Sequence, residues 1–217
     1  MITTCIFDLD GTLVDSLDDL ANTCNLILEK YQLPRHPLAS YRKFVGDGVD
    51  MLITRMLPTT HLHLQQEARN LFDIIYPNHC LDYTTMYPEI KELIDSLYSN
   101  KMYLAVVTNK PDAIAKKMVT NLFGCKFIYV YGNSSNYPRK PDPYLVNQVI
   151  RDLQVKKEEV LYIGDSDVDM LTGKNAGIKT IGVAWGFRGA QELLAHGADY
   201  VVDRASEIGD IIYDCNK

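Results

Sequence analysis

The sequence predicts an α/β fold, a doubly wound and mostly parallel sheet into which an all-helical domain is inserted. Two observations predict this. Short apolar runs alternate with amphipathic helical segments from about Tyr87 to the C-terminus, which is typical of a parallel sheet with right-handed crossovers. The stretch between Thr12 and about Leu81 contains no segment with the pattern of a strand, so we expect the insertion to be entirely helical.

Composition limits the class of protein. The chain has 217 residues, of which 47% are hydrophobic and 23% charged, enough for one large core with a substantial insertion. A net charge of −6 and the lack of a long Lys/Arg run argue against general affinity for nucleic acid. We expect no signal peptide, no contact with a membrane and a cytoplasmic location. The five cysteines are odd in number, scattered and without a CxxC pair, which favours reduced thiols.

The first strand and the insertion come first in the chain. The apolar run Ile2–Phe7 predicts a buried strand, and Ser16 is expected to cap the helix that follows. Further helical pieces are predicted over residues 38–45, 49–57 and 62–76. Gly46-Asp47-Gly48 separates two of them, either as a simple turn or as a loop that descends over a functional site, which a pair of glycines would permit.

The remaining elements alternate regularly. The predicted strands are Tyr103–Val107, Phe127–Tyr131, Val160–Ile163, Thr180–Val183 and Tyr200–Val202. Helices are predicted before the first of these, from Pro111 to Gly124, over Tyr144–Leu153 and from about Val168 to Ala176. We therefore expect a core formed by residues 1–14 and 83–217, interrupted by a helical domain formed by residues 15–82.

Two aspartates stand directly after the first strand. Asp8 and Asp10 are followed by Gly11 and Thr12. An aspartate at a strand end often only supports a turn, but two carboxylates this close repel each other unless a cation or a proton intervenes. The pair therefore predicts a metal-assisted reaction site.

Polar residues also follow later strands. Thr108 and Asn109 end the second predicted strand, and Asp165 and Asp169 follow the fourth. Lys140 lies in the loop that follows the third. Each has an ordinary explanation alone, as a helix cap, a turn or a surface residue. Parallel strands bring their carboxyl ends to one edge, where ligands bind in open sheets. The set as a whole therefore predicts a site at that edge.

The residue types indicate the chemistry. A few carboxylates together with substrate oxygens are how proteins usually hold Mg²⁺, and Asp8, Asp10 and Asp165 could supply them. Lys140 and the hydroxyl of Thr108 would balance the charge of a phosphoryl group. One of the paired aspartates would be free to act as a nucleophile through an aspartyl-phosphate, and the other as a general acid and base.

These stretches resemble the four motifs of the haloacid dehalogenase-like superfamily of phosphatases. The matching segments are Asp8–Thr12, Thr108-Asn109, Lys140-Pro141 and Gly164–Asp169, in the family's order and across nearly the whole chain. Within the superfamily the resemblance is greatest to bacterial phosphoglycolate phosphatase. The resemblance implies a Rossmann-like core with a helical cap.

The resemblance also implies roles for the residues. Asp8 is the nucleophile and Asp10 the general acid and base, while Thr108, Asn109 and Lys140 hold the phosphoryl group. Mg²⁺ is held by the carboxylates of Asp8 and Asp165 and by the backbone carbonyl of Asp10. Asp169 is either a further ligand or a residue that supports the ligands without touching the metal. Asp167-Val168 departs from the usual phosphoglycolate phosphatase pattern, in which a more basic or polar pair is expected, and this weakens the assignment of substrate.

The sequence thus predicts a Mg²⁺-dependent phosphomonoester hydrolase that acts on a small phosphorylated metabolite, with 2-phosphoglycolate as the leading candidate. The alternatives are a sugar phosphomutase similar to β-phosphoglucomutase, another small-molecule or pyrophosphate phosphatase of the superfamily, and, more remotely, a phospho-accepting signalling receiver. A receiver has no helical insertion, and its phosphorylated aspartate follows the third strand. The expected partner is a small phosphate ester, and the protein is expected to be a monomer or homodimer.

Overall fold

A computed structural model describes all 217 residues. Its main sheet has six strands in the order β5–β4–β1–β6–β7–β8, and each neighbouring pair is parallel. The strands are β1 (Thr4–Phe7), β4 (Tyr103–Pro111), β5 (Tyr129–Asn133), β6 (Val160–Gly164), β7 (Lys179–Val183) and β8 (Tyr200–Val202). The predicted doubly wound parallel sheet is confirmed. Strand order reverses beside β1, so the expected ligand-binding crevice lies at its carboxyl end.

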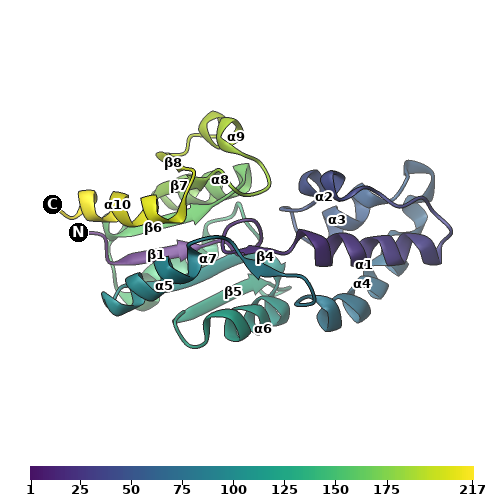
Figure 1. Cartoon of the computed structure of the whole chain (residues 1–217), viewed down its shortest axis with the longest axis horizontal. Coiled ribbons are helices and arrows are strands. Elements are labelled where there is room, and N and C mark those ends of the chain that lie inside the picture. Colours follow the sequence, from purple (N-terminus) through teal and green to yellow (C-terminus); the bar gives the residue numbers. More distant parts are fainter.

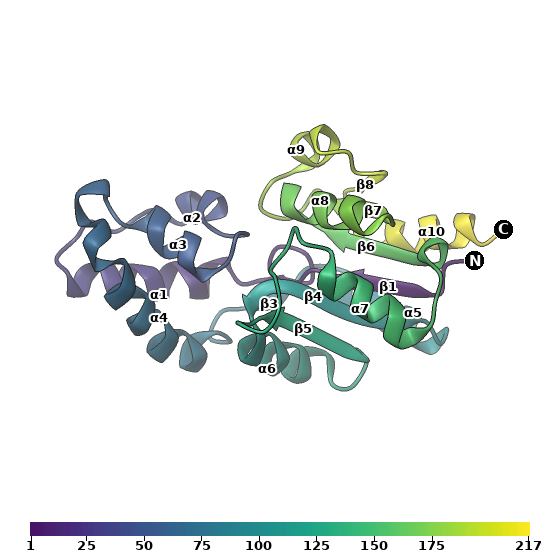
Figure 2. The ribbon, with the colours of Figure 1, turned by 180° about the vertical axis from the view of Figure 1, so that it is seen from behind.

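Helices cover both faces of the sheet (Figures 1 and 2). In β1, Cys5 and Phe7 belong to one hydrophobic cluster and Ile6 belongs to the other, as the two-residue period of a strand requires. The first cluster includes α5 (Ile90–Ser99), α6 (Asp112–Phe123) and α10 (Ala205–Cys215), and the second includes α7 (Tyr144–Leu153) and α8 (Asp167–Ala176). Burial on both faces explains why the strands are continuous apolar runs. The short elements η2 (Lys157–Glu159) and α9 (Ala190–Ala195) precede β6 and β8.

The insertion lies beyond the carboxyl end of β1 (Figure 1). It contains α1 (Leu17–Lys30), α2 (Leu38–Phe44), α3 (Val49–Met56), η1 (Thr59–Leu64) and α4 (Gln65–His79). Helix α1 packs against α2 and α4, and α3 packs against α4. None of the helices in the chain combines the length and the apolar character needed to cross a membrane.

A short ribbon joins the insertion to the sheet. Strand β2 (Val14–Asp15) pairs antiparallel with β3 (Thr85–Met86). The prediction that no strand occurs between Thr12 and Leu81 is therefore wrong at Val14–Asp15, because a two-residue strand is too short to show an alternating pattern. Ser16 occupies the predicted N-cap position of α1, but its hydroxyl makes no capping bond and donates instead to Asp10 Oδ1.

Strand β4 is longer than predicted. The prediction ended it at Val107, but it continues to Pro111, where the pairing resumes with Asn133 of β5 after a shift in register. Irregular pairing of this kind often occurs next to active sites, where it redirects side chains. Thr108 and Asn109 are consequently strand residues at the edge of the sheet rather than helix caps.

Candidate active site

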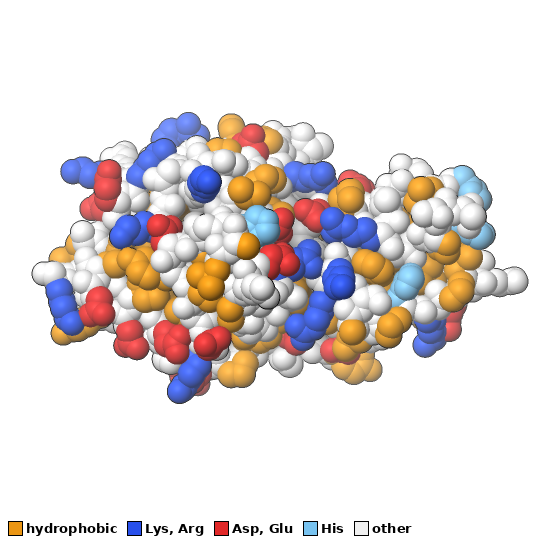
Figure 3. Space-filling view, turned by 90° about the horizontal axis from the view of Figure 1, so that it is seen from above, with side chains coloured by type: hydrophobic (Ala, Val, Ile, Leu, Met, Phe, Trp, Pro, Cys, Tyr) orange, Lys and Arg blue, Asp and Glu red, His pale blue; other side chains and the backbone are white.

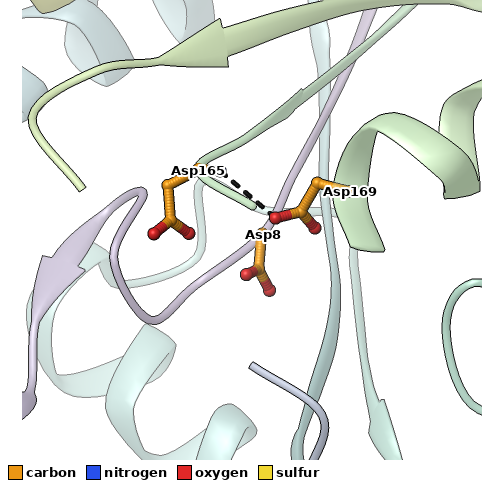
Figure 4. Close-up of side chains that lie close together, drawn as sticks. All are labelled: Asp8, Asp165 and Asp169. Atoms are coloured by element: carbon orange, nitrogen blue, oxygen red, sulfur yellow. Dashed lines mark hydrogen bonds between the residues drawn. The ribbon is translucent and has the colours of Figure 1, made fainter. Parts of the chain in front are cut away.

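Three carboxylates converge at the carboxyl edge of the sheet. Strands β1 and β6 are neighbours, with Phe7 paired to Ile163, so Asp8 and Asp165 emerge side by side. Asp169 joins them from the first turn of α8. One carboxylate oxygen from each residue lies within 4.8 Å of the others, and all three residues are buried (Figure 4). The structure thus brings together three of the predicted metal ligands.

Asp169 organises the loop around it. Its Oδ2 accepts hydrogen bonds from the backbone N–H of Asp165 at 3.2 Å, the N–H of Ser166 at 3.0 Å and the Ser166 hydroxyl at 2.6 Å. Its Oδ1 accepts from Lys140 Nζ at 2.7 Å and from the Tyr162 hydroxyl at 3.3 Å. Because protein donors already occupy both oxygens, the geometry favours a role in which Asp169 supports the metal ligands over one in which it coordinates the metal directly.

Lys140 is buried and lies between two acids. Its Nζ is 2.9 Å from Asp8 Oδ1 and 2.7 Å from Asp169 Oδ1. Asn109 fixes the backbone of Lys140, because its Oδ1 accepts from Lys140 N at 3.0 Å and its Nδ2 donates to Lys140 O at 3.3 Å. The side chain of Asn109 is therefore engaged in placing Lys140, whereas Thr108 lines the cavity beside Asp8.

Asp10 is held separately from the three clustered acids. Ser16 donates to its Oδ1, and Lys110 Nζ lies 2.8 Å from Oδ1 and 3.1 Å from Oδ2. Lys110 is a site residue that the sequence analysis did not identify. It lies in β4 two residues after Thr108 and lines the same cavity, but its place in the strand was not predicted because the strand was expected to end at Val107.

The acids carry more negative charge than the protein compensates. Burial raises the pKa of Asp8 from 3.8 to about 6, while Lys140 opposes the rise. Burial, followed by the charges of Asp169 and Asp8, raises the pKa of Asp165 well above its usual range. Asp8 Oδ1 receives no hydrogen bond, although it forms the ion pair with Lys140. Hard oxygen donors with a surplus of negative charge fit a divalent cation such as Mg²⁺.

Two glycines make room for Asp165. Gly11 has a φ of +85°, and a Cβ there would lie 2.3 Å from Asp165 Oδ2. A Cβ on Gly186 would lie 2.2 Å from Asp165 Cβ. The backbone can therefore wrap closely around this carboxylate, which also accepts the N–H of Phe187 at 2.7 Å.

A cavity lies between the core and the insertion. Its empty volume, including the open mouth, is about 570 Å³. The core contributes Asp8, Asp10, Thr108, Asn109, Lys110, Pro111, Asp165, Ser166, Phe187 and Arg188, and the insertion contributes Leu20, Val45, Gly46, Gly48, Val49, Leu52, Phe72 and Tyr76. The acids and bases thus face a largely apolar wall across the cavity.

The Gly46-Asp47-Gly48 loop forms part of this wall. Asn109 Nδ2 donates to Gly46 O at 3.1 Å, and Arg139 donates to Asp47 O at 3.0 Å. Charged side chains of both signs gather where the two parts of the molecule meet (Figure 3). Of the two interpretations of this loop, the structure favours the one in which it covers the site.

Comparison with known proteins assigns the class. The sequence model of the haloacid dehalogenase-like hydrolase family matches residues 5–183. The chain belongs to this family, and it is therefore an enzyme of the hydrolase class. The predicted family resemblance and the Rossmann-like fold are confirmed.

Two relatives and one solved structure resemble this chain over nearly its whole length. The chain is 32% identical to a phosphoglycolate phosphatase of Vibrio parahaemolyticus over 214 residues, which cover 95% of this chain and 94% of the relative. It is also 32% identical to a phosphoglycolate phosphatase of Aquifex aeolicus, with 94% and 93% covered. A haloacid dehalogenase-like family hydrolase from Streptococcus pneumoniae superimposes with a TM-score of 0.88 at 28% identity, covering 97% of this chain and 98% of that one.

Proposed function

We propose that the protein is a Mg²⁺-dependent phosphoric monoester hydrolase that works through an aspartyl-phosphate and acts on a small metabolite, with 2-phosphoglycolate as the leading substrate. The observation that carries the proposal is the pairing of buried Asp8 with Lys140 at 2.9 Å, beside Thr108 and the cavity. The substrate is suggested by the names of the relatives, and Arg188 in the cavity lining is compatible with an anionic ester.

Asp8 is the proposed nucleophile. With a pKa of about 6, its carboxylate is mostly ionised at neutral pH. One of its oxygens would attack phosphorus while the ester oxygen leaves. Lys140 and the Thr108 hydroxyl would bind the phosphoryl oxygens beside Asp8, and their positive charge and hydrogen bond would stabilise the charge that spreads over those oxygens.

Asp10 is the proposed general acid and base. It would give a proton to the departing ester oxygen and then take a proton from the water that hydrolyses the aspartyl-phosphate. Its carboxylate lines the cavity and is separate from the three clustered acids. Asp8 and Asp10, which both follow β1, would thus have different roles in the reaction.

Asp8 and Asp165 would hold Mg²⁺ with the carbonyl of Asp10, and Asp169 would keep Asp165 and Lys140 in place from behind. A bound Mg²⁺ would supply positive charge to the phosphoryl oxygens. We propose residues 15–82 as a cap domain on a core of residues 1–14 and 83–217, with the cap limiting access to small esters. A cytoplasmic location is part of the proposal and rests on the five free cysteines.

The test is a panel of phosphometabolites incubated with purified protein and Mg²⁺, in which released inorganic phosphate is measured. We expect turnover of at least one member and the highest kcat/KM for 2-phosphoglycolate. No phosphate release from any member would refute the proposal, and an isomerised sugar phosphate without net release would indicate a mutase.

Two substitutions test the roles. Asp8→Asn should abolish turnover, because an amide does not attack phosphorus. Asp10→Asn should slow formation or hydrolysis of the phosphoenzyme. Retained activity in the first variant would exclude Asp8 as the nucleophile, and an unchanged rate in the second would exclude Asp10 as the proton donor.

A further inference from the structure

Lys110 is a buried cation in the cavity to which the proposed reaction gives no role. Its side chain is 2% exposed. Its Nζ lies 2.8 and 3.1 Å from the two oxygens of Asp10 and 2.7 Å from the hydroxyl of Tyr76. An ammonium group has three hydrogens to donate, and these three acceptors can use all of them.

Tyr76 brings α4 of the insertion into this contact. Its ring stacks on Phe72, with 4.8 Å between the centroids, and Lys110 Nζ lies 4.8 Å from the Tyr76 centroid, which is within cation–π range. Burial, followed by the charge of Asp10, raises the pKa of Tyr76 well above its usual range, so the phenol stays neutral. Tyr76 therefore holds the ammonium without cancelling the positive charge that faces Asp10.

Ser16 completes the arrangement from the other side. Its hydroxyl donates to Asp10 Oδ1, while Lys110 contacts both oxygens. The carboxyl group is thereby fixed at the edge of the cavity. A proton donor has to lie within hydrogen-bond reach of the oxygen that it protonates, so the orientation of this group matters for catalysis.

We infer that Lys110 is a positioning residue that acts through Asp10, and that Tyr76 places Lys110 from the cap. The inference rests on the proposed function. In the step concerned, the bond between Asp8 and phosphorus forms, the bond between phosphorus and the ester oxygen breaks, and the proton of Asp10 passes to that oxygen. Lys110 keeps the carboxyl group aimed at the leaving oxygen.

This role predicts a dependence on the leaving group. An alkyl ester such as 2-phosphoglycolate leaves as an alkoxide and needs the proton. Acetyl phosphate is similar in size, but its acetate group leaves without one. The value of kcat/KM reports the steps up to the first irreversible one, so it isolates phosphoryl transfer to Asp8 from the later hydrolysis.

The experiment measures kcat/KM for both compounds in wild type, Lys110→Met and Tyr76→Phe. General acids contribute about 10²–10⁴-fold to rate, so a misplaced one should lower kcat/KM for the alkyl ester by about 10–100-fold in Lys110→Met. The same variant should keep acetyl phosphate hydrolysis within about 3-fold of wild type, which also shows that it is folded. Tyr76→Phe should lower kcat/KM for the alkyl ester by a smaller factor and should also leave that for acetyl phosphate nearly unchanged.

Lys117→Met is the matched control. Lys117 Nζ donates to Pro77 O at 2.6 Å, so this variant also loses a contact between core and α4, one residue from Tyr76. It should leave kcat/KM unchanged for both compounds. Equal losses for both compounds in Lys110→Met, or no loss for either, would overturn the inference. Wild-type protein that hydrolysed neither compound, nor any other member of the phosphometabolite panel, would overturn the proposed function itself.

Discussion

Asp165 shows how much of the site depends on the absence of side chains around it. Gly186 has no unusual φ, yet a Cβ there would lie 2.2 Å from Asp165 Cβ and 2.5 Å from Gly11 O. Both contacts are far below van der Waals distance and involve rigid groups. The position of this carboxylate is therefore set by neighbours that are distant in sequence.

Gly186→Ala should lower the free energy of unfolding by about 1–3 kcal/mol, the usual range for overpacking, and should reduce activity strongly because Asp165 must move. Urea unfolding and phosphate release measure the two effects. Gly209→Ala is the control, since nothing lies within 4 Å of its added Cβ in α10. That variant should be neutral or more stable by up to about 1 kcal/mol. Equal behaviour of the two variants would contradict the steric account.

Asp8 predicts a dependence of stability on pH in the absence of metal. Its pKa rises from 3.8 to about 6 on folding, so the folded state binds the proton more tightly. The ionised carboxylate therefore lowers the free energy of unfolding by about 3 kcal/mol above pH 6. This loss declines as the pH falls and is absent below about pH 4.

Asp8→Asn should therefore be more stable than wild type in EDTA at pH 7, by up to about 3 kcal/mol, with roughly half that difference at pH 5. Urea unfolding at both pH values measures this difference. A difference that did not narrow toward acid pH would show that the buried carboxylate is not the cause.

At the scale of the elements, Asp19 connects the first helix of the insertion to the segment that follows its last helix. This residue of α1 is 2% exposed. Its carboxylate accepts the N–H of Tyr83 at 3.0 Å and both the N–H and the hydroxyl of Thr84, at 2.9 and 2.7 Å. These residues lead into β3, so one side chain fixes both ends of the insertion at the ribbon.

Asp19→Asn should lower the free energy of unfolding by about 1–3 kcal/mol, because an amide replaces an ionised acceptor of several buried donors. Denaturant unfolding gives the value. The neighbouring Asp18 is exposed, and Asp18→Asn should change stability by less than about 0.5 kcal/mol. A similar loss in both variants would mean that the lost helix charge, rather than the contact with Thr84, is responsible.

At the scale of the whole molecule, the site exists only where two parts of the chain meet. The acids belong to the sheet edge, and the apolar wall belongs to the helices inserted after β1. Lys110 with Tyr76 and Asn109 with Gly46 connect the two across the cavity. Cation binding should therefore stabilise the folded protein as a unit.

Mg²⁺ at about 100 times its Kd should add about 2.7 kcal/mol to the stability of the folded state, which corresponds to a rise in Tm of roughly 5–10 °C for a chain of this length. Thermal unfolding with Mg²⁺ and with EDTA measures the shift. Asp165→Asn should abolish most of it, whereas Asp167→Asn, outside the acid cluster, should keep it. An undiminished shift in Asp165→Asn would place the cation elsewhere.

The sequence by itself determined the order along the chain of the six main-sheet strands and of the helices, the parallel pairing of those strands and the family. Those features depend on local periodicity and on short segments such as Asp8–Thr12, which can be read without knowing what they contact. Helix α7 and strand β8 agree with their predicted bounds for this reason. The site residues at the ends of strands could also be predicted, because parallel strands bring those ends to one edge.

The tertiary structure alone decided how these residues are used. The contact of Lys110 with Asp10 and the hydrogen bonds between Asn109 and Lys140 join residues far apart in the chain, and both start from the stretch of β4 where the strand pairing is irregular. No local pattern encodes such contacts. They arise because burial leaves each charged or polar group to find a partner across the fold.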